Sequence, residues 1–331
     1  MTAAVLDLGL SGSDLVSVVL RAVCVVAAFL VLPLVVGQTE HKVMAHMQGR
    51  LGPMYAGGFH GWAQLVADGV KFAQKEDVTP AAADPLLFRL APAVALVPYL
   101  VAMAAVPLSP TVVAADLDAG LLFVLAAMGV SVLGTLLAGW SSGNKYALLG
   151  GLRTAAQLLA YELPLVLAAA SVAMAAGTLS LTGIAAAWQP WWLIWQAPAA
   201  LVFLLAGLAE LARGPFDMPV ADSEIVAGPW TEYSGLRFAL FLLAEYAGIV
   251  LVSALTATLF LGGWRGPFAA TLGPVWLLAK TGLVAFVVIW LRVTWPRLRE
   301  DQLQRLAWLV LVPVALLQLV LTAVVVVAHP F

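Results

Sequence analysis

The sequence has little charge and a single cysteine, Cys24. Charged residues make up 10% of its 331 residues, and hydrophobic residues make up 63%. Soluble domains contain about 25% charged and about 45–50% apolar residues, so this composition indicates a protein that spans a membrane several times. One cysteine excludes an internal disulfide and a cysteine-ligated iron–sulfur cluster. We expect Cys24, which lies in an apolar run, to be a small buried hydrophobic residue.

The sequence also lacks the motifs of several ligand sites. It has no Gly-x-Gly-x-x-Gly fingerprint after a predicted strand and no P-loop, which argues against a nucleotide site. It has no basic patch with interleaved aromatic residues, which argues against nucleic acid as a partner. No histidine pair lies within a predicted span to ligate haem, and we predict no metal site in this chain.

Eight apolar runs of about 20 residues are long enough to cross the hydrocarbon core as helices. They cover residues 15–36, 87–107, 120–140, 156–176, 191–211, 237–261, 274–294 and 307–328. Because the runs are continuous rather than alternating, they favour helices over a membrane β-barrel. The predicted fold is an all-α membrane protein, a bundle of eight transmembrane helices in one domain, residues 1–331.

Lysine and arginine residues are concentrated in the odd-numbered loops, whereas the even-numbered loops contain only Arg265. The positive-inside rule then places the long loops 37–86 and 212–236 in the cytoplasm and both termini outside it. We expect a multi-pass protein of a bacterial-type plasma membrane. Arg21 and Lys280 lie inside predicted spans, and each either snorkels to the membrane surface or has a buried partner.

The first long loop contains a predicted amphipathic helix. Trp62, Val66 and Val70 share one helical face, and Asp68 and Lys71 share another. Such a helix lies in the plane of the membrane interface. Two interpretations remain open, an anchor in the interface or one wall of a site for an amphipathic ligand.

Carboxylates gather in and beside the fifth and sixth predicted spans. They are Glu210, Asp217, Asp222, Glu224, Glu232 and Glu245, with Glu162 on the fourth span. A charge deep in a membrane helix costs about 2.5–3.5 kcal/mol on insertion scales, so these side chains should face protein or water. Either the acids titrate as a coupled proton relay, or they pack helices together by pairing with Arg213, Arg237 and backbone donors.

Three ordered blocks of sequence carry a resemblance to a known family. The first runs Glu40-x-Lys42-x-x-Ala45-x-x-Gln48-x-Arg50-x-Gly52-Pro53 and continues at Ala67-Asp68-x-x-Lys71. The second contains Gly139-Trp140-Ser141-Ser142, Lys145-Tyr146, Leu152-Arg153, Gln157 and Tyr161-Glu162. The third contains Pro215-Phe216-Asp217-x-Pro219, Ser223-Glu224, Glu232-Tyr233-Ser234-Gly235 and Leu243-Ala244-Glu245-Tyr246. Over about residues 38–310, the chain resembles the quinone-chamber subunits in the membrane arm of proton-translocating NADH–quinone oxidoreductase, respiratory complex I.

The resemblance implies a role for each block. In this family the subunit joins the membrane arm to the peripheral arm, completes the quinone chamber and couples quinone reduction to proton translocation. The implied chamber residues are Glu40, His41, Arg50, Asp68 and Lys71. The implied proton-relay and coupling residues are Glu162, Glu210, Asp217, Asp222, Glu224 and Glu245, with Arg153, Arg213 and Arg237 as supporting cations.

The resemblance also implies how the chemistry is divided among subunits. This chain alone is expected to bind no cofactor. Quinone, either ubiquinone or menaquinone, is a substrate shared with partner subunits, and NADH, FMN and iron–sulfur clusters belong to other subunits. The implied partners are the peripheral-arm iron–sulfur and quinone-site subunits, small and antiporter-like membrane subunits, and the lipid bilayer. Two alternatives are the homologous membrane subunit of an energy-converting hydrogenase and an autonomous ion transporter.

The chain departs from the family pattern at a few positions. His41 replaces a usual arginine, so a fixed charge becomes a titratable one. Met54 replaces a usual asparagine, and Leu65 replaces a usual proline. Val220 replaces a usual glutamate and Asp222 replaces another, so the acidic loop has one carboxylate fewer than expected.

Overall fold

The computed structural model describes residues 15–328, apart from the side chains of Leu15, Ser17, Asp222 and Ser223. Every regular element within this part of the chain is helical. The long helices are α1 (Leu15–Met47), α3 (Pro85–Met103), α4 (Gly120–Ser141), α5 (Lys145–Ala176), α10 (Gly235–Phe260) and α11 (Ala269–Thr294). A last long helix consists of α12 (Glu300–Leu306), a π-helical turn η4 (Ala307–Leu311) and α13 (Val312–Ala328). These seven are long and apolar enough to cross a membrane.

Shorter helices connect the long ones. They are η1 (Phe59–Gly61), α2 (Gln64–Gln74), α6 (Leu181–Ala187), α7 (Trp192–Trp195), α8 (Ala197–Glu210), η2 (Met218–Val220), α9 (Asp222–Ile225) and η3 (Gly228–Trp230). The amphipathic helix expected in the first loop is α2. None of its residues is buried, and Trp62, Val66 and Val70 are exposed apolar residues.

The predicted fifth span, residues 191–211, is divided in the structure. It forms α7 and α8, which meet at Gln196. α8 has 14 residues, a length of about 21 Å at 1.5 Å per residue, against about 30 Å of hydrocarbon. Pro198 lies in the first turn of α8, where a proline is tolerated but does not continue a preceding helix. The predicted count of eight continuous spans is therefore not confirmed.

Two helices extend beyond the apolar runs from which they were predicted. α1 continues to Met47 instead of ending near residue 36, and α5 begins at Lys145 instead of residue 156. Glu40 and His41 consequently lie on α1, and Arg153 lies on α5, although all three were expected in loops. Hydropathy identifies only the membrane-embedded part of a helix. The backbone hydrogen bonds of α1 and α5 continue beyond that part, so both helices are longer than their apolar runs.

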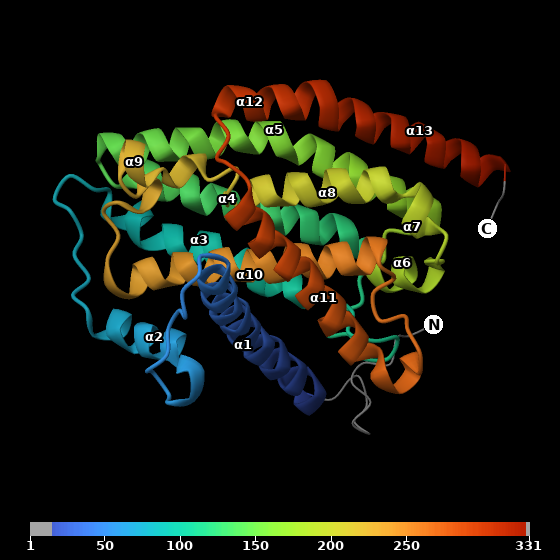
Figure 1. The fold of residues 1–331 in the computed structure, drawn as a ribbon, viewed down its shortest axis with the longest axis horizontal. Helices are drawn as coiled ribbons and strands as arrows, with labels where there is room; N and C mark the ends of the chain where they lie inside the picture. The colour runs from blue at the N-terminus through green and yellow to red at the C-terminus, as the bar shows by residue number, and fades with distance from the viewer. Residues whose placement is uncertain (1–14, 329–331) are drawn as a thin grey trace.

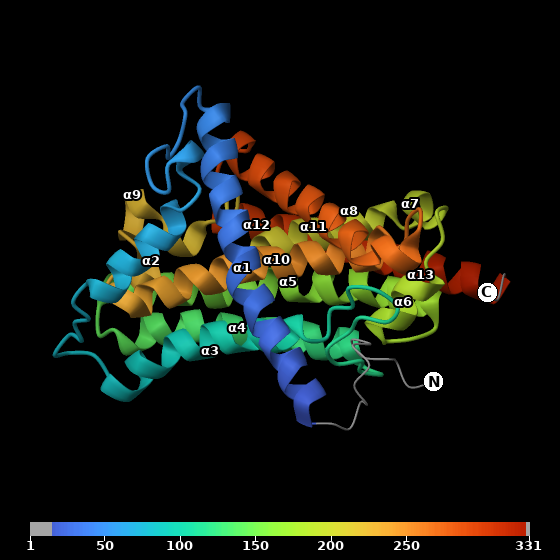
Figure 2. The same cartoon turned by 90° about the horizontal axis from the view of Figure 1, so that it is seen from below.

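The long helices form a bundle with α10 at its centre (Figures 1 and 2). α3, α4 and α5 pack side by side, α10 packs on α3, and α8 and α13 cover α5. In the most apolar 18-residue stretch of α10, 61% of the residues are buried. In the corresponding stretch of α1, only 11% are buried. α1 crosses α10 and α11 at an angle, as a peripheral helix (Figure 2).

Small residues allow close helix packing in the bundle. At Gly134 on α4, an added Cβ would lie 2.6 Å from the Cα of Ala95 on α3, so any side chain there would push the two helices apart. Close backbone approach of this kind is the usual packing mode between membrane helices. Residues of α3 and α4 also line the cavity next to Glu210 and Glu245 that is described below.

Candidate functional site

A buried ion-pair cluster joins α1, α10, α11 and the loop after α8. Glu40 on α1 is 1% exposed, and its two carboxylate oxygens pair with Arg213 and Arg292. Arg213 Nε also donates to Glu245 Oε1 on α10 at 2.7 Å. The Arg213 guanidinium lies 4.7 Å from the centre of the Tyr246 ring. Two carboxylates thus face two guanidiniums, which is the balance that buried charges require.

The cluster connects a residue implied for the quinone chamber with a residue implied for the proton relay. Glu40 was implied for the quinone chamber and Glu245 for the proton relay, and Arg213 contacts both. Arg292 was not among the predicted site residues. The only sequence feature that could have indicated Arg292 is its position in the last turn of a membrane helix. Its partner Glu40 is 252 residues away, so no local pattern connects the two.

Gln157 on α5 holds the segment that carries Glu210 and Arg213. Its amide Nε2 donates to the carbonyls of Ala209, at 2.5 Å, and Phe216, at 2.9 Å. Gln157 is 1% exposed, so these two bonds are shielded from water. Gln157 belongs to the second sequence block, which implied no role for it, and its two hydrogen bonds make it a positioning residue.

Glu210, the last residue of α8, lies between two cavities. It is 7% exposed, and neither carboxylate oxygen has a hydrogen-bond partner among the described atoms. One cavity, of about 60 Å³, is lined by Glu210 and Glu245. The other, of about 190 Å³, is lined by Glu210 and Glu162. A water needs roughly 10–15 Å³ of such space and two or more polar partners, so both cavities are large enough for several waters.

Hydroxyl groups line both cavities. The smaller one includes Tyr99, Ser131 and Thr154, and the larger one includes Tyr161, whose buried hydroxyl has no hydrogen-bond partner among the described atoms. Glu162 is exposed on the outer face of α5. A carboxylate in the middle of a membrane helix is expected to face protein or water rather than lipid.

Asp217 and Glu224 form a second, more exposed cluster with arginines. Arg153 NH1 is 2.7 Å from Glu224 Oε2, and Arg297 Nε is 3.1 Å from Asp217 Oδ1. Arg297 also lies 4.0 Å from Glu224. The hydrogen bond and positive charge of Arg153 hold the pKa of Glu224 below its ordinary value. Glu224 is therefore ionised near neutral pH, as expected for an acid that pairs with arginine.

The acidic residues therefore have different surroundings in the structure. Asp217 and Glu224 are paired with arginines, whereas Glu210 is a buried carboxylate without a partner among the described atoms. Arg237 also acts as a pairing cation: its guanidinium is 2.9 Å from Asp77 and 2.9 Å from Thr79 Oγ1, which ties the first long loop to α10. The side chain of Asp222 lies outside the described atoms.

The remaining predicted chamber residues lie apart from the Glu40 cluster. Asp68 and Lys71 pair with each other on α2 at 3.4 Å, and the exposed Arg50 donates to Gln48 at 2.9 Å. Among the described residues, no ion pair or hydrogen bond joins these three to Glu40. His41 follows Glu40 on α1 and is half-buried, and its Nδ1 has no partner among the described atoms.

Comparison with known proteins identifies the family. A protein-family model described as "NADH dehydrogenase" matches residues 20–323. The chain belongs to the NADH dehydrogenase family. It is 49% identical over 289 residues to the H subunit of NADH-quinone oxidoreductase from Geobacillus kaustophilus (strain HTA426), covering 86% of this chain and 87% of that protein. It is 48% identical over 289 residues to the H subunit of NADH-quinone oxidoreductase from Anoxybacillus flavithermus (strain DSM 21510 / WK1), again covering 86% of this chain and 87% of that protein. The resemblance drawn from the three sequence blocks is thereby confirmed.

In this NADH dehydrogenase family member, two further residues, Cys24 and Lys280, can be compared with their expectations. Cys24 is exposed rather than buried, because α1 is peripheral. Lys280 has partners within the protein: its half-buried Nζ donates to the carbonyls of Leu261, Gly263 and Arg265 at 2.7–2.9 Å, which fixes the loop after α10. Within residues 15–328, no group of three or more metal-ligating side chains is present.

Proposed function

We propose that this chain is the membrane subunit of a complex I-type NADH–quinone oxidoreductase that helps form the quinone chamber and couples quinone reduction to proton translocation. The observation that carries the proposal is the position of Glu210, which shares one cavity with Glu245 and another with Glu162. Through Arg213, Glu245 is in turn connected to Glu40. The acids therefore form a continuous series from the end of α1 to the outer face of α5.

The series supports transmission of charge by a simple electrostatic step. Arg213 divides its positive charge between Glu40 and Glu245. A change of charge at Glu40 therefore acts on Arg213 and, through Arg213, on Glu245. Waters in the smaller cavity would connect Glu245 with Glu210, and waters in the larger cavity would connect Glu210 with Glu162, as a path for protons. NADH, flavin and iron–sulfur chemistry is assigned to partner subunits.

The series ends at Glu162, which is exposed on the outer face of α5. We assign this face to a neighbouring membrane subunit, and the arginine cluster around Asp217 and Glu224 to the side of the peripheral arm. We further place the long loops on the cytoplasmic side of a bacterial plasma membrane, supported by the distribution of lysine and arginine.

The proposal is tested by isolating the chain from its native membrane through an affinity tag. We expect co-purification of iron–sulfur and antiporter-like subunits together with NADH–quinone reductase activity. Recovery of a nickel-containing subunit without quinone reductase activity would favour the hydrogenase alternative. Ion transport by the purified chain alone in liposomes would favour the autonomous transporter.

The exposed apolar face of α2 gives a prediction for quinone access. Val66 and Val70 are 52% and 54% exposed, next to Trp62 at 65%. Replacing both valines by glutamine is expected to raise the KM for a long-chain quinone several-fold, because the amides weaken contact with an apolar tail or with the membrane. A short-chain water-soluble quinone should keep its KM. Lys75→Gln, at the exposed residue directly after α2, is the control. Equal effects of both changes on both quinones would contradict the assignment.

The Arg153–Glu224 pair gives a prediction on pH dependence. Because the folded-state pKa of Glu224 is lowered, the pair stabilises the protein above the ordinary glutamate pKa of about 4.3 and loses this contribution as pH falls through the lowered value. Arg153→Gln should therefore cause a small decrease in the thermal midpoint of the assembled enzyme at pH 7 that vanishes in acid. Arg299→Gln, which removes only a distant charge, should have a smaller effect. A decrease that persists below the lowered pKa would show that Arg153 acts by packing.

A further inference from the structure

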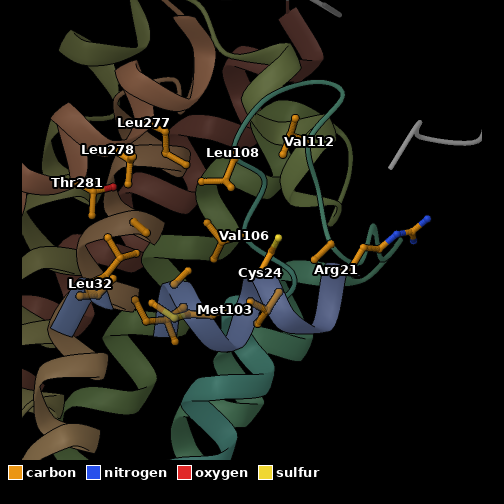
Figure 3. Close-up of a pocket in the computed structure, with 16 residues that line it drawn as sticks. Arg21, Cys24, Leu32, Met103, Val106, Leu108, Val112, Leu277, Leu278 and Thr281 are labelled. Atoms are coloured by element: carbon orange, nitrogen blue, oxygen red, sulfur yellow. The ribbon is translucent and has the colours of Figure 1, made fainter. Parts of the chain in front are cut away.

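An apolar groove lies beside the first half of α1, at the opposite end of this helix from Glu40. It runs between the first half of α1, the segment 103–114, α10 and α11 (Figure 3). Its walls include Cys24, Leu32, Val106, Leu278 and Thr281, and Arg21 lies at one end. None of the carboxylates of the proposed proton series lines it.

The length of the groove matches the depth of one membrane leaflet. Its α1 wall runs from Arg21 to Leu32, which is about 16 Å at 1.5 Å per residue. The hydrocarbon core of a bilayer is about 30 Å thick, so one leaflet contributes about 15 Å. An extended acyl chain that begins at the level of Arg21 would therefore end near the inner end of the groove.

The charge at the end of the groove is complementary to a phosphate. Among the described residues, Arg21 is the only charged one that lines it. In Figure 3 its guanidinium points away from Leu32 and Thr281, along α1 towards the beginning of the helix. Its Nε is buried without a hydrogen-bond partner among the described atoms. A guanidinium offers a planar fork of donors that fits phosphate oxygens, and an arginine near a helix end lies at the level of the headgroups.

We propose that this groove binds one phospholipid, with an acyl chain along α1 and its phosphate on Arg21. The lipid fills the space between α1 and the bundle, where α1 is otherwise the least buried of the seven long apolar helices in residues 15–328. It thereby fixes the helix that carries Glu40 at its other end. The site does not depend on the proposed proton series.

The test uses the assembled enzyme in vesicles of phosphatidylglycerol and phosphatidylethanolamine that contain a phospholipid with a photoactivatable acyl chain. Labelled peptides are mapped and normalised to the amount of assembled enzyme. We expect labelling of α1 around Ala28 and Leu32 and of α11 around Leu278. Arg21→Gln should lower it at least threefold, Arg21→Lys should retain most of it, and Ala28→Phe, which fills the groove, should abolish it.

Two control variants match these changes. Val26→Phe adds similar bulk on α1 at an exposed position outside the groove, and Lys75→Gln removes an exposed cation elsewhere. Both should leave labelling unchanged. Labelling that persists in both Arg21→Gln and Ala28→Phe, or that falls equally in the controls, overturns the proposal.

Thr281 distinguishes an acyl chain from a polar ligand. Its hydroxyl is buried without a hydrogen-bond partner among the described atoms and lies at the inner end of the groove. An acyl chain offers no group to this hydroxyl, so Thr281→Val should leave labelling unchanged. A marked loss of labelling in Thr281→Val, or competition by an isoprenoid quinone, would contradict the phospholipid. Either result would indicate a ligand that places a polar group at the inner end of the groove.

Discussion

Replacing Arg213 by glutamine is expected to destabilise the protein by several kcal/mol, about 3–5, because it leaves buried charge without compensation. The Arg213 side chain is 2% exposed and holds Glu40 and Glu245 together. With the guanidinium gone, Glu245 loses its cation and Glu40 keeps only Arg292. We expect little assembled enzyme in the membrane and a sharply lower thermal midpoint for whatever assembles.

Two further variants separate lost charge from lost packing. Adding Glu245→Gln to Arg213→Gln removes the carboxylate that has lost its cation, so the double variant should recover part of the midpoint. Arg237→Gln serves as the matched control: its side chain is 19% exposed and its partner Asp77 is 35% exposed, a setting in which an ion pair contributes about 1 kcal/mol or less. Equal losses in Arg213→Gln and Arg237→Gln would show that the buried cluster carries no special stability.

The helical membrane fold was largely predictable, because apolar runs of span length are a strong signal. Composition predicted the fold class, and the amphipathic pattern of the first loop predicted α2. The boundaries were less predictable. The polar end of α1, which carries Glu40, continues as helix where hydropathy falls. The fifth predicted span has enough apolar residues but is interrupted at Gln196.

Partners across the chain were not predictable from sequence. Glu40 lies 173 residues from Arg213 and 252 residues from Arg292, and no local spacing rule connects such positions. Likewise, the sequence places Glu210 and Glu224 in one acidic segment. Only the fold shows that one is buried without a described partner while the other is paired with Arg153. Neighbours in sequence have different electrostatic environments because α8 ends in the bundle and α9 lies at its surface.

Glu210→Gln is expected to lower coupled proton translocation at least tenfold, which corresponds to about 1.4 kcal/mol or more on the rate-limiting barrier. Glutamine has nearly the shape of glutamate but neither releases nor accepts a proton at neutral pH. Glu210 is the residue that both cavities share, so its loss interrupts the series between Glu245 and Glu162. The measurement is proton uptake and quinone reduction by the reconstituted enzyme in the same vesicles.

The choice of control decides between a proton-carrying and a structural role of Glu210. Glu232→Gln changes a nearby half-buried carboxylate that accepts a hydrogen bond from Asn144 at 2.5 Å and lines neither cavity. It should leave translocation close to that of the unmodified enzyme. Glu210→Asp keeps a titratable group and should retain part of the activity. Because neither Glu210 oxygen has a partner among the described atoms, glutamine breaks no described hydrogen bond. Stable assembly with normal translocation in Glu210→Gln would therefore remove Glu210 from the proton path, rather than point to a folding defect.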